Sequence, residues 1–534
     1  MEVIVFTEFT SLKKALRLVV VAVAIGVLVL QVAAAPVQPG WTMAGQNVIN
    51  WRYQPFEDTI SRDNVGKLAP KWVFTTAGDV SATPSVSDGA VYVPDWAGYL
   101  YKLNAATGAV IWQVNLSTLT GIPGEISRST PTLAGSTLLV GTQRGALMLA
   151  FNKDTGALLW RTQMDAHPFA VITQSPSVLN GVAYVGVSSI EEAIAGVVPG
   201  YVCCTFRGSI SAFNVATGQI IWKTYTTLDN GGAPDQYSGA SVWGSTPVID
   251  TKRGSLFITT GNNYNVPQAV KDCQTATPNA VCDAAGNYFD AILSLNLTTG
   301  AVNWATKLGG YDAWNVACLF GGINCPTPAG PDFDFGQGAM LIPTEIKGKN
   351  QDVLAAGQKS GVFWGLNPNT GAVLWATQAG PGGTLGGLEW GSATDGKRIY
   401  YAIANSYGLP FTLVNGQAVT GGLWGALDPA NGKVLWQTAD PNGFANNGID
   451  PGAVSVANGV VYAGSLARPA TSPTFFALNA ANGKIMWSYV SGGSVNSGAA
   501  IVNGTVYWGS GYSNFGLGSP NNKFYAFGLP KSNH

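Results

Sequence analysis

The residues "ATGAVIW" at 106–112 begin a pattern that returns along most of the chain. In all seven copies a glycine stands four residues before a tryptophan, and the other copies lie at 154–160, 216–222, 298–304, 369–375, 430–436 and 481–487. A Thr-Gly or Asn-Gly pair supplies the positive φ of a tight turn. The apolar residues that follow are typical of a strand that ends at the tryptophan. Each copy therefore predicts a β-hairpin.

The segments upstream of these turns also repeat. "TPSVSDGAVYVPDWAGYLYKLN" at 83–104 and "TPTLAGSTLLVGTQRGALMLAFN" at 130–152 both show a short strand after Thr-Pro, a turn, and two more apolar strands. Four strands in a unit of about 40–80 residues is typical of a β-propeller blade. The units are too short for βαβ crossovers, and the chain after its N-terminal segment lacks a 3.6-residue apolar period. We therefore expect an all-β fold.

The number of blades follows from the two ends of the repeat. Trp72, in "NVGKLAPKWVF", has no Thr-Gly turn before it, and the last segment, "VYWGSGYSNFGLGSPNNKFYAFG" at 506–528, lacks a closing tryptophan hairpin. The strand around Trp72 can supply the outer strand that the last blade lacks. This closure predicts an eight-bladed propeller of four-stranded antiparallel blades, without the exposed edge that an open sheet would leave.

The start of the chain predicts export. A basic beginning, the apolar run Leu18–Leu30 and the small residues of "QVAAAP" follow the order of a secretory signal. We expect a signal peptide at 1–35, a propeller at 36–534, and a secreted or periplasmic protein without a stable membrane span after cleavage. An uncleaved anchor is the alternative. The net charge of −1, with 11% charged residues, gives no basic stripe for nucleic acid.

Six cysteines in an oxidising compartment can form three disulfides. Cys273 and Cys282 flank one polar insert, and Cys318 and Cys325 flank another, so local pairing closes a short loop in each. That leaves the adjacent Cys203 and Cys204 for each other. Two free buried thiols remain the alternative for this last pair.

The repeat and several local segments resemble a known enzyme family. These segments are "SRSTP" at 127–131, "HPFAVIT" at 167–173, "CCTFRGS" at 203–209 and "GGYDAWNVAC" at 309–318. Together they resemble the pyrroloquinoline quinone (PQQ) alcohol dehydrogenases, in particular the polyvinyl-alcohol-dehydrogenase-like branch. The resemblance implies oxidation of an alcohol or polymeric alcohol, with PQQ and calcium as cofactors. No C-x-x-C-H run occurs in the sequence, so the chain has no covalent c-type haem and an external electron acceptor is expected.

The resemblance also implies a calcium site and a base. "VGVSSIEE" matches the segment that carries a calcium-binding glutamate, which places Glu191 there with Glu192 as a neighbouring candidate. Asn262 and Asp332 match the other metal ligands, and calcium takes six to eight such oxygens. Asp332 also matches the general base, and Asp312 is the fallback.

The cofactor contacts follow from the same comparison. Trp243 matches a tryptophan that stacks on the quinone, and Lys359 matches the basic residue at the quinone oxygens. Three further residues match cofactor contacts: Arg128, Thr173 and Ser188. A Cys203–Cys204 ring would form a flat wall opposite Trp243.

Some features depart from the family pattern. The adjacent cysteines lie one blade later than in the better-known alcohol dehydrogenases, and Ser81 stands near the place of an early glutamate. An insert separates Asp312 from Asp332. The alternative is therefore a cofactor-free secreted propeller that acts as a binding or scaffold module. His167, one of only two histidines, is expected to be structural.

Overall fold

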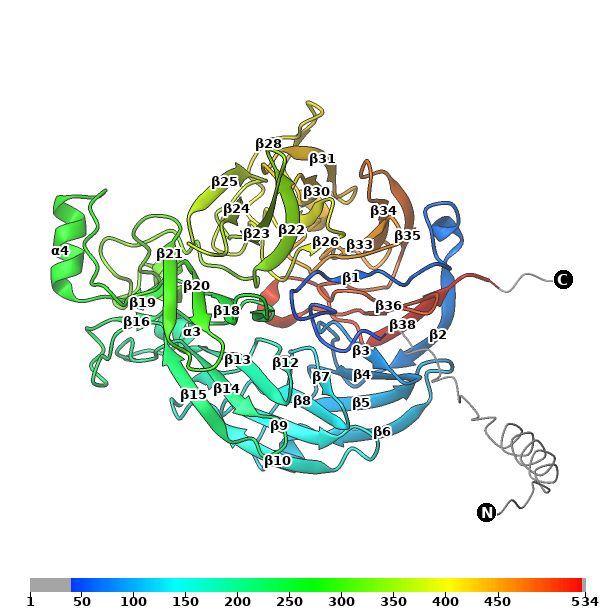
Figure 1. The fold of residues 1–534 in the computed structure, drawn as a ribbon, viewed down its shortest axis with the longest axis horizontal. Helices are drawn as coiled ribbons and strands as arrows, with labels where there is room; N and C mark the ends of the chain where they lie inside the picture. Colours follow the sequence, from blue (N-terminus) through cyan, green and yellow to red (C-terminus); the bar gives the residue numbers. More distant parts are fainter. Residues whose placement is uncertain (1–39, 531–534) are drawn as a thin grey trace, which may run out of the picture. The chain divides into compact units, whose positions relative to one another are not determined.

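Eight antiparallel sheets stand around one axis in the computed structural model, which describes residues 40–530 (Figure 1). The predicted signal peptide lies outside these residues. Within 40–530, no helix has the length and apolarity that crossing a membrane requires. The all-β, eight-bladed prediction is confirmed.

The first four blades, each given from the axis outward, consist of the following strands: β3 (Ser85–Ser87), β4 (Ala90–Pro94), β5 (Tyr99–Asn104), β6 (Val110–Asn115); β7 (Thr132–Ala134), β8 (Thr137–Gly141), β9 (Leu147–Asn152), β10 (Leu158–Gln163); β12 (Ser177–Leu179), β13 (Val182–Ser189), β14 (Ser209–Asn214), β15 (Ile220–Tyr225); β17 (Val248–Asp250), β18 (Ser255–Thr259), β20 (Ala291–Asn296), β21 (Val302–Lys307). The short β11 (Ala170–Val171) extends the third blade by pairing with β13.

The last four blades consist of these strands: β22 (Met340–Ile346), β23 (Lys349–Gly357), β24 (Val362–Leu366), β25 (Val373–Gln378); β26 (Ala393–Thr394), β27 (Ile399–Ile403), β30 (Leu423–Leu427), β31 (Val434–Ala439); β32 (Ser455–Ala457), β33 (Val460–Gly464), β34 (Phe475–Asn479), β35 (Ile485–Tyr489); β36 (Ala500–Val502), β37 (Thr505–Gly509), β38 (Lys523–Gly528), β2 (Ala69–Thr75). The minor elements are β1 (Tyr53–Gln54), β16 (Ser238–Gly239), β19 (Asn263–Asn265), β28 (Phe411–Thr412), β29 (Ala418–Val419), α2 (Leu116–Thr120), α3 (Glu191–Val197), α4 (Gln268–Ala276), η1 (Val65–Lys67), η2 (Val316–Phe320), η3 (Phe444–Asn446) and η4 (Asn514–Gly516).

The ring closes as expected. β2 pairs antiparallel with β38, and Trp72 lies opposite Ala526. An early strand therefore supplies the outer strand of the last blade, so that the edge of β38 is not left unpaired.

The repeated glycine and tryptophan hold neighbouring blades together. Gly108 has a φ of +74°, and a Cβ added to it would stand 2.7 Å from the Trp72 ring of the preceding blade. The Trp72 Nε1 donates a 3.1 Å hydrogen bond to the Ala105 carbonyl of the same turn. The tryptophans lie within the outer strands rather than at their ends, as Trp112 does in β6, so the expectation of a strand ending at tryptophan was wrong in detail.

An asparagine or aspartate four residues before each of these glycines completes the turn. Asn104 Oδ1 accepts hydrogen bonds from the backbone N–H groups of Ala106 and Thr107, both 3.0 Å. Asn152 and Asn214 do the same in the next two blades. Such side-chain acceptors favour turns over continued strand.

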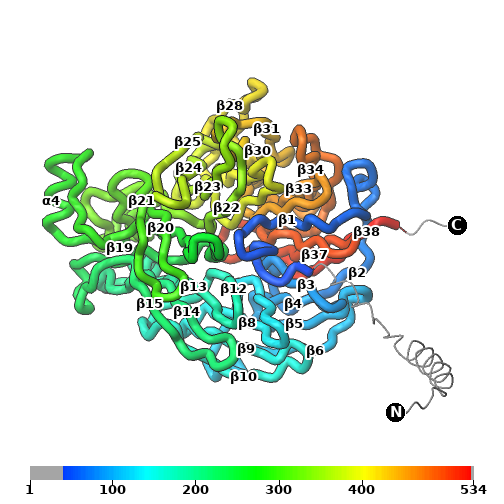
Figure 2. Tube along the Cα trace, viewed as in Figure 1, coloured from blue at the N-terminus to red at the C-terminus, as the bar shows by residue number. Residues whose placement is uncertain are grey.

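Residues 41–54, here called the axial strap, run along the free edges of the innermost strands. The backbone of the strap exchanges hydrogen bonds of 2.8–3.2 Å with one residue from each of six blades, namely Val86, Leu133, Ile249, Leu341, Thr394 and Val456. Figure 2 shows this segment as dark-blue trace near the centre of the ring. Because these edge groups would otherwise lack partners, the strap satisfies them and closes part of the axis.

The two long inserts carry the local disulfides. Cys273 in α4 bonds to Cys282, Cys318 in η2 bonds to Cys325, and Cys203 bonds to Cys204. All three predicted pairs are confirmed, and no free cysteine is found in the described chain.

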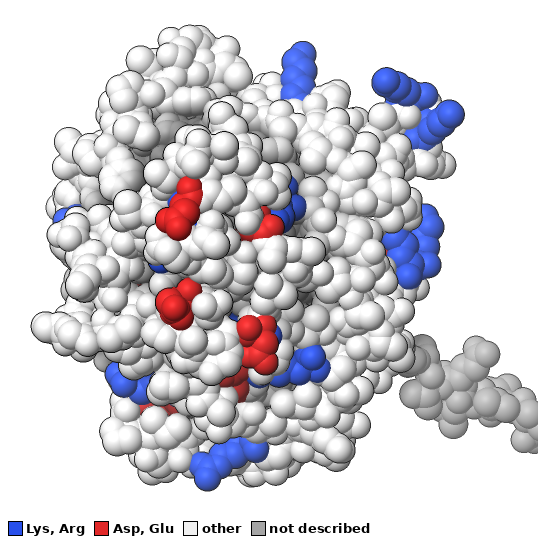
Figure 3. All heavy atoms as spheres, turned by 90° about the vertical axis from the view of Figure 1, so that its left-hand side faces the viewer, with Lys and Arg blue, Asp and Glu red and all other residues white. Residues whose placement is uncertain are grey.

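The side of the propeller that carries α4 shows few and scattered charged side chains (Figure 3).

A buried acid pair lies in the loop between β31 and β32. Asp450 is 0% exposed, its oxygens accept no hydrogen bond from the described residues, and the Asp440 carboxylate acts on it electrostatically. Burial raises the pKa of Asp450 well above its ordinary value, and the Asp440 carboxylate raises it further. The folded state therefore favours the protonated Asp450.

Asp450→Asn should stabilise the protein at neutral pH. A carboxyl with a raised folded-state pKa contributes stability below its unfolded pKa of about 3.9 and loses it as pH rises toward the folded value. Asparagine cannot ionise, and its amide can still donate to Asp440. We expect a gain of about 1 kcal/mol or more at pH 7–8, because a buried mismatch of this kind costs about 1–3 kcal/mol. The gain in urea midpoint should disappear near pH 4, and the exposed Asp58→Asn should show no such trend.

Candidate functional site

One lysine joins two buried aspartates at the centre of the candidate site. Lys359 follows β23, and its Nζ lies 3.2 Å from both carboxylate oxygens of Asp332 and 2.6 Å from Oδ1 of Asp334. The Lys359 backbone N–H also donates to the Asp334 carbonyl at 3.1 Å. The structure thus brings together the predicted Lys359 and Asp332 and adds Asp334.

Trp243 is fixed beside this cluster. Its Nε1 donates a 2.6 Å hydrogen bond to Oδ2 of Asp334, and the Lys359 Nζ lies 5.3 Å from its ring centroid. Trp390 packs edge-on against it, with ring centroids 5.2 Å apart and planes at 76°. Sequence reasoning missed Asp334 and Trp390, although the "DFD" run offered a second acid beside Asp332.

Asp312 holds the backbone that carries Asp332. Its two oxygens accept hydrogen bonds from the backbone N–H groups of Asp332, at 3.0 Å, and Phe333, at 2.6 Å. Asp332 itself has a φ of +61°, a region that aspartate and asparagine tolerate better than most residues. Burial raises the pKa of Asp312 to about 6. Asp312 therefore positions Asp332.

The site has more carboxyl groups than cations. Lys359 forms ion pairs with Asp332 and Asp334, and Glu192 and Glu389 are near enough to influence its pKa electrostatically. Burial raises the pKa of Glu192 to about 8, and burial raises the pKa of Glu389 to about 7; Lys359 opposes both shifts. Burial likewise raises the pKa of Asp332 well above its ordinary value. Crowded acids of this kind either take up protons or bind a cation.

The side chain of Asn262 has an amide oxygen that no described residue contacts as a hydrogen-bond donor. Its Nδ2 donates to the carbonyls of Trp314, at 2.9 Å, and Asn263, at 3.1 Å. Its Oδ1 accepts no hydrogen bond from the described residues, although the side chain is buried. That oxygen is suited to a hard cation.

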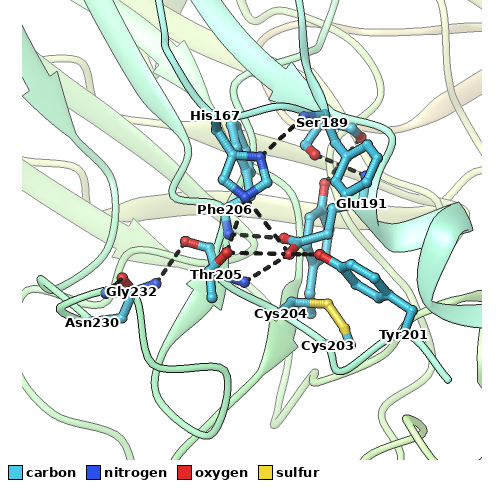
Figure 4. A network of polar contacts seen from close by, with 12 residues as sticks. His167, Ser189, Glu191, Tyr201, Cys203, Cys204, Thr205, Phe206, Asn230 and Gly232 are labelled. Atoms are coloured by element: carbon cyan, nitrogen blue, oxygen red, sulfur yellow. Dashed lines mark hydrogen bonds and ion pairs between the residues drawn. A yellow bond between two sulfur atoms is a disulfide. The ribbon is translucent and has the colours of Figure 1, made fainter.

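Both carboxylate oxygens of Glu191 already accept hydrogen bonds from neighbouring residues of the protein. It is 0% exposed at the start of α3, and it accepts hydrogen bonds from Tyr201 Oη at 2.5 Å and from the backbone N–H groups of Thr205 and Phe206, both 2.8 Å (Figure 4). His167 Nε2 lies 3.7 Å from the same carboxylate and 3.0 Å from Thr205 Oγ1. Glu191 and His167 therefore hold the 201–206 loop, whereas the adjacent Glu192 is coupled electrostatically to Lys359.

The Cys203–Cys204 pair lies in that loop (Figure 4). Both cysteines are buried, the Cys204 N–H donates to the Pro234 carbonyl at 3.1 Å, and the Cys203 N–H donates to Asn324 Oδ1 at 3.3 Å. The loop is thus tied on both sides of the pair. The flat wall for a cofactor stays a prediction.

Arg128, Thr173 and Ser188 are the remaining predicted cofactor contacts. Arg128 stacks on Trp390, with its guanidinium carbon 4.2 Å from the ring centroid. The Thr173 hydroxyl donates to the Trp243 carbonyl at 3.3 Å. Ser188 lies in β13 opposite Val171 of β11.

The residues of the candidate site are compatible with both calcium and PQQ, the two cofactors that the resemblance implies. In residues 40–530, no three His, Cys, Asp or Glu side chains form a ready-made metal cluster. The crowded acids around Lys359 and the free Asn262 oxygen nevertheless suit calcium, which prefers carboxylate and amide oxygens. Arg128 and Lys359 offer positive charge for a quinone with carboxylates, and the partly exposed Trp243 offers an aromatic face.

Comparisons with known proteins agree with this class of fold. The family model described as outer membrane protein assembly factor BamB matches residues 51–316 and 420–514. Among solved structures, a quinohemoprotein alcohol dehydrogenase from Pseudomonas putida HK5 has a TM-score of 0.69 at 18% identity, covering 92% of this chain and 80% of its own. One from Comamonas testosteroni has a TM-score of 0.67 at 19% identity, covering 93% and 81%. The fold is thus that of the quinoprotein propellers.

Proteins of similar sequence identify the family to which the chain belongs. A polyvinylalcohol dehydrogenase of Sphingopyxis sp. is 30% identical over 517 residues, which cover 89% of this chain and 72% of the relative. Another, from Pseudomonas sp., is 28% identical over 506 residues, covering 89% and 73%. The chain belongs to the polyvinyl alcohol dehydrogenase family, a branch of the PQQ-dependent alcohol dehydrogenases.

Proposed function

We propose that this protein oxidises the hydroxyl groups of an alcohol, with PQQ and calcium as its cofactors. One observation carries the proposal: a single ammonium, Lys359, pairs with the carboxyls of Asp332 and Asp334 beside the Trp243 ring, with Glu192 and Glu389 close enough to act on it electrostatically. A structural ion pair needs one acid, whereas this excess of carboxyls supports a cation site with a base. When bound, the quinone would supply the acceptor for the two electrons of the alcohol.

Asp332 is proposed to take the hydroxyl proton of the alcohol. Its carboxylate is buried, its backbone is held by Asp312, and Lys359 holds both oxygens in place. A base whose position is fixed in this way has the geometry that proton transfer requires. Asp334 orients Lys359 and Trp243 at the same time, so it acts as a positioning residue.

The cofactor contacts are proposed residue by residue. Trp243 would lie against one face of the quinone, and Cys203–Cys204 against the other. Lys359 would meet its ring oxygens, and Arg128, Thr173 and Ser188 its polar periphery. Asn262, Asp332 and one of the two adjacent glutamates would hold calcium. The contacts of Glu191 and Glu192 favour Glu192, because Glu191 already accepts three strong hydrogen bonds.

A large substrate with an apolar backbone fits the surroundings of the site. α3, which begins at Glu191, packs against η2. These two elements and the loops that follow them expose a group of apolar side chains: Val197, Val198, Val202, Leu319, Phe320 and Ile323. An exposed apolar surface of this kind is typical of a binding surface. We therefore propose a polymeric secondary alcohol as substrate, a secreted or periplasmic location, and an external electron acceptor.

The test is reconstitution. Purified protein is titrated with PQQ in calcium, then assayed with an artificial electron acceptor on a polymeric alcohol and on a small secondary alcohol. The proposal expects a change in the quinone absorption spectrum and calcium-dependent oxidation, faster per hydroxyl at equal concentration for the polymer. Quinone that neither binds nor supports oxidation would leave the cofactor-free scaffold as the function. Equal rates on both alcohols would remove the polymer from the proposal alone.

Separate substitutions of Glu191 and Glu192 distinguish the glutamate that binds calcium from the one that holds the 201–206 loop. Glu192→Gln should weaken calcium binding about tenfold or more, because affinity depends on the number of charged ligands. Glu191→Gln should mainly lower the unfolding midpoint, because an amide nitrogen would face N–H donors of Thr205 or Phe206. Calcium titration and urea unfolding of both variants measure this. If added calcium restores Glu191→Gln and not Glu192→Gln, Glu191 is the ligand.

A further inference from the structure

A group of exposed apolar side chains lies on the loops around the sixth blade. It consists of Leu385, Tyr407, Leu409 and Phe444, here called the apolar rim, and each side chain is 42–48% exposed. Leu385 stands in the loop from β25 to β26, Tyr407 and Leu409 follow β27 in the loop that carries the β28–β29 hairpin (Figure 1), and Phe444 lies in η3. Single exposed apolar residues are common, whereas a cluster marks a binding surface.

Direct contacts join the loops that carry the rim. The Tyr407 hydroxyl shares a hydrogen bond with Oγ1 of Thr384, the residue before Leu385. A Cβ added to Gly408 would stand 2.8 Å from the Phe444 ring, so this ring lies directly against the loop that follows β27. The rim is therefore one continuous surface built from three loops.

Asn405 fixes the backbone around Tyr407. It is 1% exposed, its Nδ2 donates to the carbonyls of Leu409 and Thr420, both at 2.9 Å, and its Oδ1 accepts the Leu409 N–H at 2.9 Å. Its φ of +48° is one that asparagine tolerates better than most residues. Because the loop is already held in place, a ligand that binds to the Tyr407 ring pays little for ordering it.

Tyr407 adjoins the lysine cluster of the candidate site. Its ring lies against Gly383, where an added Cβ would stand 2.7 Å from Cδ2 of the ring, and the Gly383 N–H donates to the Lys359 carbonyl at 3.0 Å. Burial raises the pKa of Tyr407, the Asp332 carboxylate raises it further, and Lys359 lowers it. The phenol is thus within electrostatic reach of the proposed base and of its lysine.

The composition of the rim suits an uncharged ligand. The segment 404–422 contains no charged residue, and the loop at 381–391 contains one, Glu389, which belongs to the candidate site. Hydroxyl groups of Thr384, Ser406 and Tyr407 stand among the apolar side chains. A polymeric secondary alcohol presents methylene groups and hydroxyls in turn, so such a surface matches both. A charged partner would find no complementary charge in segment 404–422.

We propose that the apolar rim binds the part of a polymeric alcohol that lies next to the reacting hydroxyl, and that Tyr407 is a specificity-determining residue for long chains. This inference rests on the proposed function, which places the reacting hydroxyl at Asp332. The Tyr407 ring packs against the polymer backbone, which a small alcohol at Asp332 lacks. Because the contact is the same before and during the reaction, it lowers KM for the polymer and leaves kcat unaffected.

The first test measures binding without catalysis. A short poly(vinyl alcohol) is titrated into the cofactor-free protein by calorimetry. Tyr407→Ala should weaken binding about tenfold, since it removes the burial of a half-exposed aromatic ring. Tyr407→Phe keeps the ring and should bind like the wild type. Leu435→Ala, which truncates a 41% exposed side chain in β31 of the same blade, is the matched control and should also bind like the wild type.

Two results of this titration overturn the proposal. One is a wild-type affinity in Tyr407→Ala, and the other is an equal loss in Tyr407→Phe, because the ring would then not be the contact. Sedimentation of the same samples tests another occupant of the rim. If Tyr407→Ala changes the oligomeric state and not the polymer affinity, the rim is a contact between copies of the chain.

The second test uses the enzyme loaded with PQQ and calcium. The ratio of kcat/KM for the polymer to kcat/KM for 2-propanol should fall about tenfold in Tyr407→Ala, through KM of the polymer, and should stay constant in Leu435→Ala. An unchanged ratio in an enzyme that oxidises both alcohols contradicts the rim and leaves the proposed function standing. If the wild type oxidises neither alcohol, the proposed function fails, and the titration alone decides whether the rim binds the polymer.

Discussion

Asp332→Asn should lower the rate of alcohol oxidation by about 10²–10⁴-fold, the range that removal of a general base typically produces. The substitution suits the site, because asparagine tolerates the positive φ at this position and keeps the side-chain shape. Lys359 retains its 2.6 Å ion pair with Asp334, so the cluster should stay folded. The measurement is kcat with PQQ, calcium and substrate at saturation. The quinone spectrum shows whether the cofactor is still bound.

Asp312→Asn is the matched control for this prediction. Asp312 accepts the backbone N–H groups of Asp332 and Phe333, so its loss should disturb the position of Asp332 without removing the base. We expect a smaller loss of kcat and a lower urea midpoint. If Asp332→Asn oxidises alcohol at the wild-type rate while Asp312→Asn does not, then Asp312 is the base and Asp332 is not.

Gly108→Ala should cost about 2–5 kcal/mol of folding free energy. A left-handed backbone costs about 1–2 kcal/mol for a residue with a Cβ. A Cβ at this position would also stand 2.7 Å from Cδ2 and Cε3 of Trp72, and overpacking of this kind costs about 1–3 kcal/mol more. Because Trp72 lies on the strand that closes the ring, the strain falls on the closure itself. Urea unfolding followed by tryptophan fluorescence measures the effect.

Gly89→Ala, in the same blade, separates the two causes. Gly89 has a φ of +71°, close to that of Gly108, and an added Cβ would meet nothing within 4 Å. Gly89→Ala should therefore show only the cost of the left-handed backbone. Equal losses at the two glycines would mean that contact with Trp72 contributes nothing to stability.

The sequence predicted some residues of the candidate site and missed others. Asp332, Lys359 and Trp243 stand in short segments that resemble those of the family, and the structure brings them together. Asp334 was missed because, in sequence, it is one more loop acid beside Asp332. The choice between Glu191 and Glu192 was open for a physical reason: adjacent residues at the start of a helix point in different directions, and only the position of the 201–206 loop decides which one it occupies.

By itself, the sequence determined the architecture: the spacing of glycine and tryptophan is a local property, and its repetition specifies one blade after another. The unmatched Trp72 segment and the unfinished last blade were also enough to determine how the ring closes. The arrangement around the axis was decided only by the tertiary structure. Lys359 meets Asp332 and Asp334 there, and Arg52 of the axial strap donates a hydrogen bond to the carbonyl of Val454, 402 positions further along the chain. Local propensity carries no information about such contacts, because they depend on how eight blades converge and on which buried charges find a partner.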